Sequence, residues 1–249
     1  MGVANGNAEV LRRGLKSLRA TTDFTRNVML PGVLGLTGVI AALGSFVSPK
    51  GPGSSDHNAR ERIANVLTSI PFVLVGCHTV KKRRTANGKL YGASLMGVGA
   101  ASMTFHASSG EWRCFARKMD YWAIAVSTAC MNTAVFPGVH PLVWGLGVLF
   151  IPFKPFAVSS INTSAMEAEY LRRAHKNPEL RPAQLLHSST CGLGLGCFCC
   201  EEKAPQTPLL HSVWHLTACL SCATTNGLLA DVENSQFARA QQLAVHTSS

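Results

Sequence analysis

Three histidines lie at spacings that suit a metal site. His106 ends the apolar stretch ASMTFH, and His211 and His215 are four residues apart in HSVWH, at the start of the last apolar stretch. Residues at i and i+4 project from the same face of a helix, so His211 and His215 are expected to present both imidazoles to one point. An ionisable residue inside a membrane-spanning segment indicates a functional site. Three histidines are a common ligand set for Zn²⁺.

A serine and an aspartate extend this set. Ser102 precedes His106 by four residues and is expected to share its helix face, and Asp120 follows in KMDYW after a short connection. Zinc with three histidine ligands keeps a position for water and lowers the pKa of that water to about 7. The Asp120 carboxylate would take a proton, and the Ser102 hydroxyl would stabilise a developing oxyanion. The residues therefore predict metal-assisted hydrolysis of an amide or ester.

The apolar content predicts that these residues sit on membrane helices. Of 249 residues, 47% are hydrophobic, and they gather in blocks. A membrane-spanning helix needs about 20 mostly apolar residues. The blocks are rich in small side chains, which suits helices packed closely in a membrane. The sequence predicts an all-α, polytopic membrane bundle of about seven transmembrane helices, with candidate spans at residues 29–48, 62–80, 90–107, 118–136, 141–158, 183–200 and 207–229.

The basic residues indicate how the spans are oriented. The formal charge is +10, but the basic residues flank the apolar blocks, so we expect no nucleic-acid partner. Basic clusters in residues 12–26 and 81–84 both favour the cytoplasmic side. Two crossings, at 29–48 and 62–80, satisfy this. His106 is then expected near the far leaflet.

The middle of the chain does not fit a single crossing. The last helix must start on the far side if its histidines are to reach His106, so the chain should enter and leave residues 137–182 on the cytoplasmic side. Two arrangements remain. One is a short or re-entrant segment broken at Pro152 and Pro155, and the other is a second crossing through the polar residues 159–172, buried among the other helices.

The remaining polar residues near these blocks have less specific patterns. We expect Glu111 and Arg113, in the connection before Asp120, to lie in a solvated loop. The other histidines lack the ordered arrangement and are interpreted as loop or helix-end residues: His78, His140, His175 and His187.

The ordered set of Ser102, His106, Asp120 and the HSVWH pair resembles the alkaline ceramidases and the wider superfamily of membrane hydrolases that includes adiponectin-receptor-like proteins. The stretch ERIANVLTSIPF is also similar to the start of their first core helix, and the resemblance covers residues 61–229. It implies a seven-helix fold in which His106, His211 and His215 bind zinc, Asp120 acts as base and Ser102 supports the oxyanion. The implied reaction releases a sphingoid base and a fatty acid from ceramide or phytoceramide among the membrane lipids, in the endoplasmic reticulum, the Golgi or another organelle.

The resemblance also divides the chain. Residues 1–28 would be a basic tail, 29–48 an additional transmembrane helix, 61–229 the ceramidase-like domain and 230–249 a polar tail. Members of the family carry an acidic calcium-binding segment near the start of this domain. The corresponding region, residues 53–62, offers only Asp56, Asn58 and Glu61, which leaves calcium dependence open.

Two other functions are compatible with the same residues. The zinc-bound water would also attack esters, so a membrane phospholipase or acyl-ester hydrolase is one alternative. The other is a non-catalytic membrane scaffold or receptor of the same superfamily, in which the metal only holds helices together. The shortened middle and the weakly acidic segment at 53–62 favour this third hypothesis.

Overall fold

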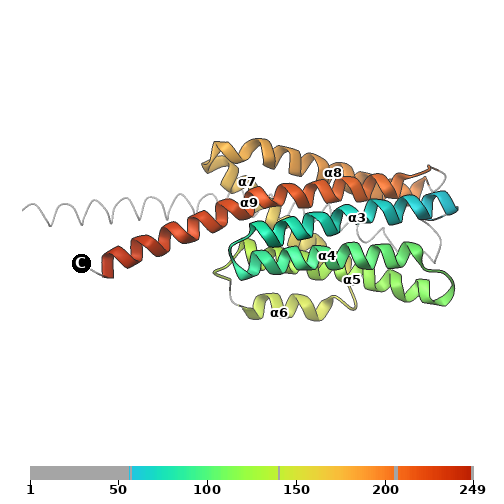
Figure 1. Cartoon of the computed structure of the whole chain (residues 1–249), viewed down its shortest axis with the longest axis horizontal. Coiled ribbons are helices and arrows are strands. Elements are labelled where there is room, and N and C mark those ends of the chain that lie inside the picture. The colour runs from blue at the N-terminus through green and yellow to red at the C-terminus, as the bar shows by residue number, and fades with distance from the viewer. Residues whose placement is uncertain (1–55, 57, 140, 205–206, 248–249) are drawn as a thin grey trace, which may run out of the picture.

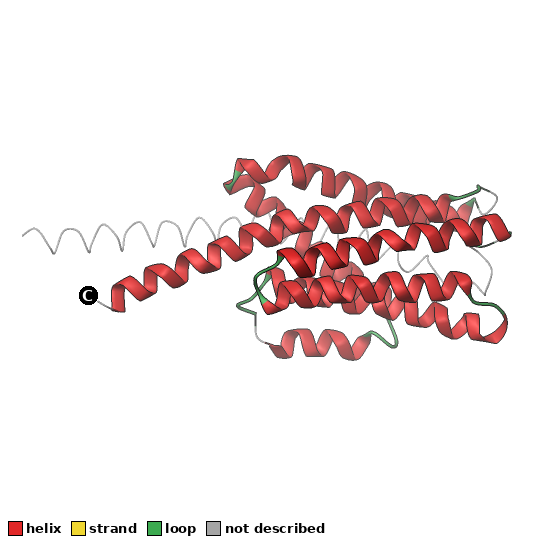
Figure 2. Cartoon of the chain, viewed as in Figure 1, coloured by secondary structure: helices red, strands yellow, loops and turns green. Residues whose placement is uncertain are grey.

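The computed structural model describes residues 56, 58–139, 141–204 and 207–247, and within these residues the chain forms seven α-helices, one short 3-10 helix and no strand (Figure 2). The prediction of an all-α fold is confirmed. The expected basic tail at 1–28 and additional helix at 29–48 lie outside the described residues. The elements are α3 (Ala59–Lys82), α4 (Ala86–Ala107), α5 (Gly110–Val135), α6 (Pro141–Phe150), α7 (Pro155–Lys176), η2 (Pro178–Leu180), α8 (Arg181–Lys203) and α9 (Leu210–Thr247).

The long helices form an elongated bundle (Figure 1). α3 packs against α4 and α9, α4 against α5, α5 against α7, and α8 against α9. One end of the bundle, the histidine end, contains Asp56, the connection 108–109 and the start of α9. The other end, the basic end, contains the connection 83–85 and η2. α9 is longer than expected, because it continues to Thr247 and projects beyond the basic end.

Local sequence explains where the first helices begin. The Asn58 side chain accepts a hydrogen bond from the Glu61 backbone N at 3.0 Å and caps α3. The Thr85 hydroxyl caps α4 in the same way, accepting from Gly88 N at 3.1 Å. Only residues 83–85 connect α3 to α4, so the two helices run antiparallel.

Glycines allow the backbones of α3 and α4 to lie close to each other. A Cβ at Gly76 would lie 2.6 Å from Gly92 O, and a Cβ at Gly92 would lie 2.7 Å from Val80 N. Neither position can hold a larger residue without separating the helices. Small residues at a helix crossing are the usual means of close packing in membrane bundles.

The middle region consists of a short helix, a break and a longer helix. α6 has only 10 residues, which corresponds to about 15 Å, half of the roughly 30 Å of a bilayer core. The chain then breaks at 151–154, and α7 begins with Pro155 in its first turn. Both boundaries of the region lie at the basic end, because Asn87 Nδ2 donates to Thr133 O at 3.1 Å and Asn177 Nδ2 donates to Asp231 Oδ1 at 3.0 Å.

The acidic residues of α7 are paired inside the bundle. Glu169 accepts hydrogen bonds from Arg172 and, at 2.7 Å, from Arg173. Glu167 Oε1 lies 3.0 Å from Nε2 of His187, which is 2% exposed. The expectation that His187 is a loop or helix-end residue is therefore wrong, since it lies within α8 and joins α7 to α9 through Ser221 O, 2.9 Å from its Nδ1.

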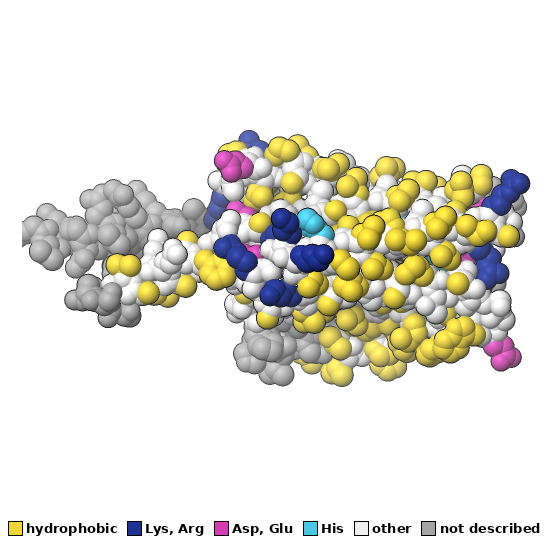
Figure 3. All heavy atoms as spheres, viewed as in Figure 1, with side chains coloured by type: hydrophobic (Ala, Val, Ile, Leu, Met, Phe, Trp, Pro, Cys, Tyr) yellow, Lys and Arg dark blue, Asp and Glu magenta, His cyan; other side chains and the backbone are white. Residues whose placement is uncertain are grey.

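Exposed apolar side chains cover the middle of the bundle. Figure 3 shows them along the visible face, with Lys and Arg gathered toward the ends. Among the described residues, one helix is both long and apolar enough to cross a membrane by length and composition, and this helix is α3. Its outer face includes Leu67 and Leu74, which are 57% and 63% exposed.

Candidate metal centre

The structure brings His106, His211 and His215 together at the histidine end. His106 lies in the last turn of α4, and the other two lie in the first two turns of α9. One ligand atom from each lies within 4.8 Å of the others. His106 and His215 are buried, at 0% and 1% exposure, and His211 is partly buried. Residues 105 positions apart in the sequence thus form one cluster.

Two of these rings are held by carboxylates. His106 Nδ1 lies 3.0 Å from Asp56 Oδ2, and His211 Nδ1 lies 2.8 Å from Glu201 Oε2. An ionised carboxylate only accepts hydrogen bonds, so the hydrogen-bond network assigns the proton of each ring to Nδ1. In both rings the Nε2 lone pair is left free to bind a metal.

The third ring, His215, is assigned the same tautomer because its Nδ1 contacts a hydroxyl group that accepts a hydrogen bond. Thr68 Oγ1 donates its hydrogen to the Ala64 carbonyl at 2.8 Å. With its hydrogen assigned to that bond, Thr68 Oγ1 accepts at its 3.0 Å contact with His215 Nδ1, and the network assigns the ring proton to this atom. The Nε2 atom of His215 is consequently unprotonated as well.

The free nitrogen atoms fit a zinc ion. His106 Nε2 and His211 Nε2 are buried and have no hydrogen-bond partner among the described residues. A buried polar atom without a partner is costly, and a metal ion would satisfy it. Metal-bound histidines in proteins usually donate their other ring N–H to a carboxylate, a backbone carbonyl or a water molecule, and His106 and His211 have carboxylates in this position. The donor set therefore fits Zn²⁺, although the nitrogen atoms alone do not distinguish it from other divalent transition metals.

Ser102 is next to the cluster. It lies on α4, is 3% exposed, and its Oγ is 3.5 Å from His215 Nε2. Its other neighbour is Ser69 Oγ on α3, at 2.9 Å, and Ser69 also donates to the Asn65 carbonyl at 2.7 Å. Ser69 thus holds the Ser102 hydroxyl beside the histidines.

Asp120 lies on α5 and is 3% exposed. Its Oδ1 is buried with no hydrogen-bond partner among the described residues, and the carboxylate lies within electrostatic range of His211. A buried carboxylate oxygen without a donor is available to accept a proton or a hydrogen bond from a bound molecule. The Oδ1 atom of Asp120 is therefore available to accept a proton, as a general base must.

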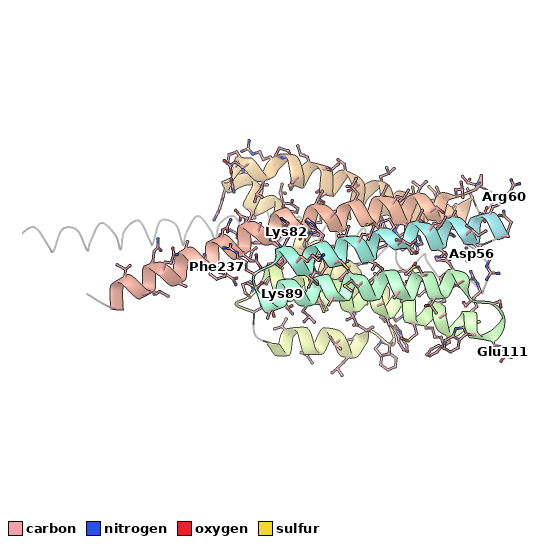
Figure 4. The ribbon with its side chains drawn as sticks, viewed as in Figure 1. Asp56, Arg60, Lys82, Lys89, Glu111 and Phe237 are labelled. Carbon is pink, nitrogen blue, oxygen red and sulfur yellow. The ribbon has the colours of Figure 1, made fainter. Side chains whose placement is uncertain are left out.

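Asp56 lies at the histidine end of the bundle, where Figure 4 labels it, and contacts residues of three helices. Besides His106 it binds Asn65 Nδ2 at 2.8 Å and the Arg113 guanidinium. Burial alone would raise the pKa of Asp56, but hydrogen bonds from His106, Arg113 and Asn65 hold this pKa well below its usual value. The expectation of a solvated loop at Arg113 is wrong, since Arg113 is buried in the first turn of α5 and also donates to Phe105 O at 3.1 Å. Glu111 is exposed in the same turn.

The sequence prediction included the three histidines, Ser102 and Asp120 but missed the residues that orient the rings. Glu201 had a usable signal, since it directly follows the apolar residues 183–200 and lies ten positions before His211. For Asp56 the sequence indicates only a possible part in a calcium-binding segment. Thr68 had no signal, because a hydroxyl within an apolar helix usually bonds to its own backbone.

We compared the chain with family models, curated proteins and solved structures. No family model matches the chain, and no curated protein and no solved structure does so.

Proposed function

We propose that this chain is a multi-pass membrane hydrolase that uses zinc. The observation that carries the proposal is the buried set of three histidines, each with Nδ1–H held by an acceptor and Nε2 turned to the cluster. A structural zinc site usually has four protein ligands, whereas a catalytic site has three and keeps one position open. Three histidines with a free carboxylate and a hydroxyl nearby match the second kind.

The chain's own residues supply the remaining parts of a hydrolytic site. When bound, zinc would supply a water of lowered pKa and polarise a carbonyl group. Asp120 is buried and its Oδ1 is unpartnered, so it would accept a proton and pass it to the leaving group. In the structure the Ser102 hydroxyl donates to Ser69 Oγ, and during the reaction it would turn this hydrogen to the oxygen that becomes negative. Asp56 and Glu201 would keep two of the rings in the ligand tautomer.

The proposed substrate is the amide of ceramide or phytoceramide, giving a sphingoid base and a free fatty acid. This choice rests on the resemblance of the Ser, His, Asp, His, His order to the alkaline ceramidases. The apolar outer surface and the length of α3 support a location in a membrane, for which the resemblance suggests the endoplasmic reticulum or the Golgi.

The test uses the full chain purified in detergent, stripped of metal and then reloaded with zinc. Labelled ceramide and labelled phospholipid are supplied in parallel, to the wild type and to Asp120→Asn. We expect ceramide hydrolysis that disappears on stripping, returns with zinc, and is at least a hundredfold weaker in Asp120→Asn although the variant still binds zinc.

The other outcomes identify the alternatives. Turnover of phospholipid alone would replace the amidase with an acyl-ester hydrolase. Zinc bound without turnover of either lipid would favour a scaffold or receptor, and hydrolysis that ignores metal would overturn the role of the histidines.

A further inference from the structure

A groove runs along α3 beside the metal centre. It has a volume of about 590 Å³, and the residues that line it include Asp56, Arg62, Ile63, Val66, Leu67 and His106. This volume falls in the range of about 300–1,000 Å³ that is typical of small-molecule sites. His106 belongs both to the groove wall and to the histidine cluster, so the groove borders the candidate metal centre.

The two ends of the groove differ in chemistry. Asp56 and Arg62 lie at the end next to His106. Further along the helix, the wall consists of Ile63, Val66 and Leu67, which lie on one side of α3 at spacings of three and four residues. Ile63 and Leu67 remain 59% and 57% exposed. A ligand that matches both parts has a polar group joined to an apolar chain.

The polar end is rigid. The Arg62 guanidinium donates to three carbonyls at the end of α4: from Nε to His106 O at 3.2 Å, and from Nη2 to Ala107 O at 2.9 Å and Ser108 O at 2.8 Å. These bonds join the first turns of α3 to the last turn of α4. The groove wall and the His106 backbone are therefore fixed relative to each other.

We propose that this groove is the lipid-binding site through which the substrate reaches the metal centre. The apolar chain lies against Ile63, Val66 and Leu67, and the polar group lies near Asp56 and Arg62, next to His106. The exposed apolar wall opens on the outer side of α3, so a lipid approaches sideways from the bilayer. The identity of this lipid as the substrate rests on the proposed hydrolase, whereas its binding in the groove does not.

Photolabelling tests binding without turnover. The purified full chain is incubated with a ceramide that carries a diazirine in its acyl chain, and the labelled peptides are mapped. We expect labelling of residues 59–67 to exceed labelling of 70–78 on the same helix, and excess unlabelled ceramide to compete with it. Uniform or uncompeted labelling along α3 would contradict lipid binding in the groove, even if the protein hydrolyses ceramide. Competed labelling of the groove without hydrolysis would support the lipid-binding site and contradict the proposed hydrolase function.

A pair of tryptophan variants tests the groove in catalysis. Leu67→Trp fills the apolar wall, and Leu74→Trp is the matched control, because Leu74 lies two turns further along α3, is similarly exposed and does not line the groove. We expect Leu67→Trp to lower kcat/KM for a long-chain ceramide at least tenfold more than for a short-chain analogue, and Leu74→Trp to change neither. Equal effects of the two variants, or an equal loss for both substrates, would contradict the proposal.

Discussion

The carboxylate of Glu201 offers a direct test of how the metal centre is built. Its Oε2 lies 2.8 Å from His211 Nδ1, and both side chains are 11% exposed, so solvent screens this contact little. Glu201→Gln retains an amide oxygen that can accept from Nδ1–H but removes the negative charge. Glu201→Ala also removes the acceptor and leaves the N–H of a partly buried ring unpaired.

The expected losses of zinc affinity follow from what each of these two substitutions removes. Removing a residue that orients a metal-bound histidine typically lowers metal affinity 10- to 100-fold, or by about 1.4–2.7 kcal/mol. We expect Glu201→Gln to be near the lower value, because the ligand tautomer of His211 is kept. Glu201→Ala should be near the upper value, since an unsatisfied buried donor costs about 1–3 kcal/mol.

The assay is zinc affinity, measured by competition with chelators of graded strength on the purified full chain. Glu111→Gln is the matched control, because Glu111 is an exposed acid at the same end of the bundle (Figure 4). If Glu201→Gln and Glu201→Ala bind zinc as tightly as Glu111→Gln, Glu201 does not orient a ligand, and the tautomer argument for His211 fails.

Three further outcomes are expected. Ser102→Ala should keep zinc and lower kcat about 10²–10³-fold, as loss of an oxyanion donor does, whereas Ser94→Ala on the same helix should not; equal kcat values would remove Ser102 from the reaction. Gly76→Ala should destabilise the bundle by about 1–3 kcal/mol, because its Cβ would meet Gly92 O, whereas Gly97→Ala, with nothing within 4 Å, should stabilise it by about 0.5–1 kcal/mol; thermal unfolding that ranks them the other way would contradict the α3–α4 crossing. Free zinc at a thousand times its Kd should raise the free energy of unfolding by about 4 kcal/mol, and an unchanged melting temperature would show that no metal binds the folded chain.

Apolar blocks predicted where helices lie but did not always predict both of their ends. Residues 90–107 correspond closely to α4 (Ala86–Ala107), because Thr85 caps the start and the apolar run stops at Ala107. The block 207–229 predicted the beginning of α9 but not its continuation to Thr247. Hydropathy reports which residues can be buried in an apolar environment, whereas a helix continues as long as its residues favour it, and residues 230–247 contain no Gly or Pro.

In the candidate site, too, the sequence predicted some of the residues and not others. The i, i+4 spacing of His211 and His215 puts two rings on one face by helix geometry alone, so the sequence was sufficient to predict that pair. The acceptors that hold the rings come from three other places: a residue before α3, the third turn of α3 and the end of α8. Which loop or helix end meets a given ring depends on how the helices pack, and no local pattern in a single sequence encodes it.

Asp56 illustrates why the acceptors cannot be treated as independent of the fold. It holds His106 and Arg113, and through Asn65 it is linked to Ser212 on α9, whose hydroxyl donates to Asn65 Oδ1 at 2.6 Å. The same carboxylate therefore orients a candidate ligand and joins α3, α4, α5 and α9 at the histidine end. Asp56→Asn would disturb both the metal affinity and the packing of these helices, and a loss of activity in that variant would not separate the two. Glu201 lies outside this network: its Oε2 bonds to His211, and its Oε1 has no hydrogen-bond partner among the described residues, so the metal affinity of the Glu201 variants reports on the ligand itself.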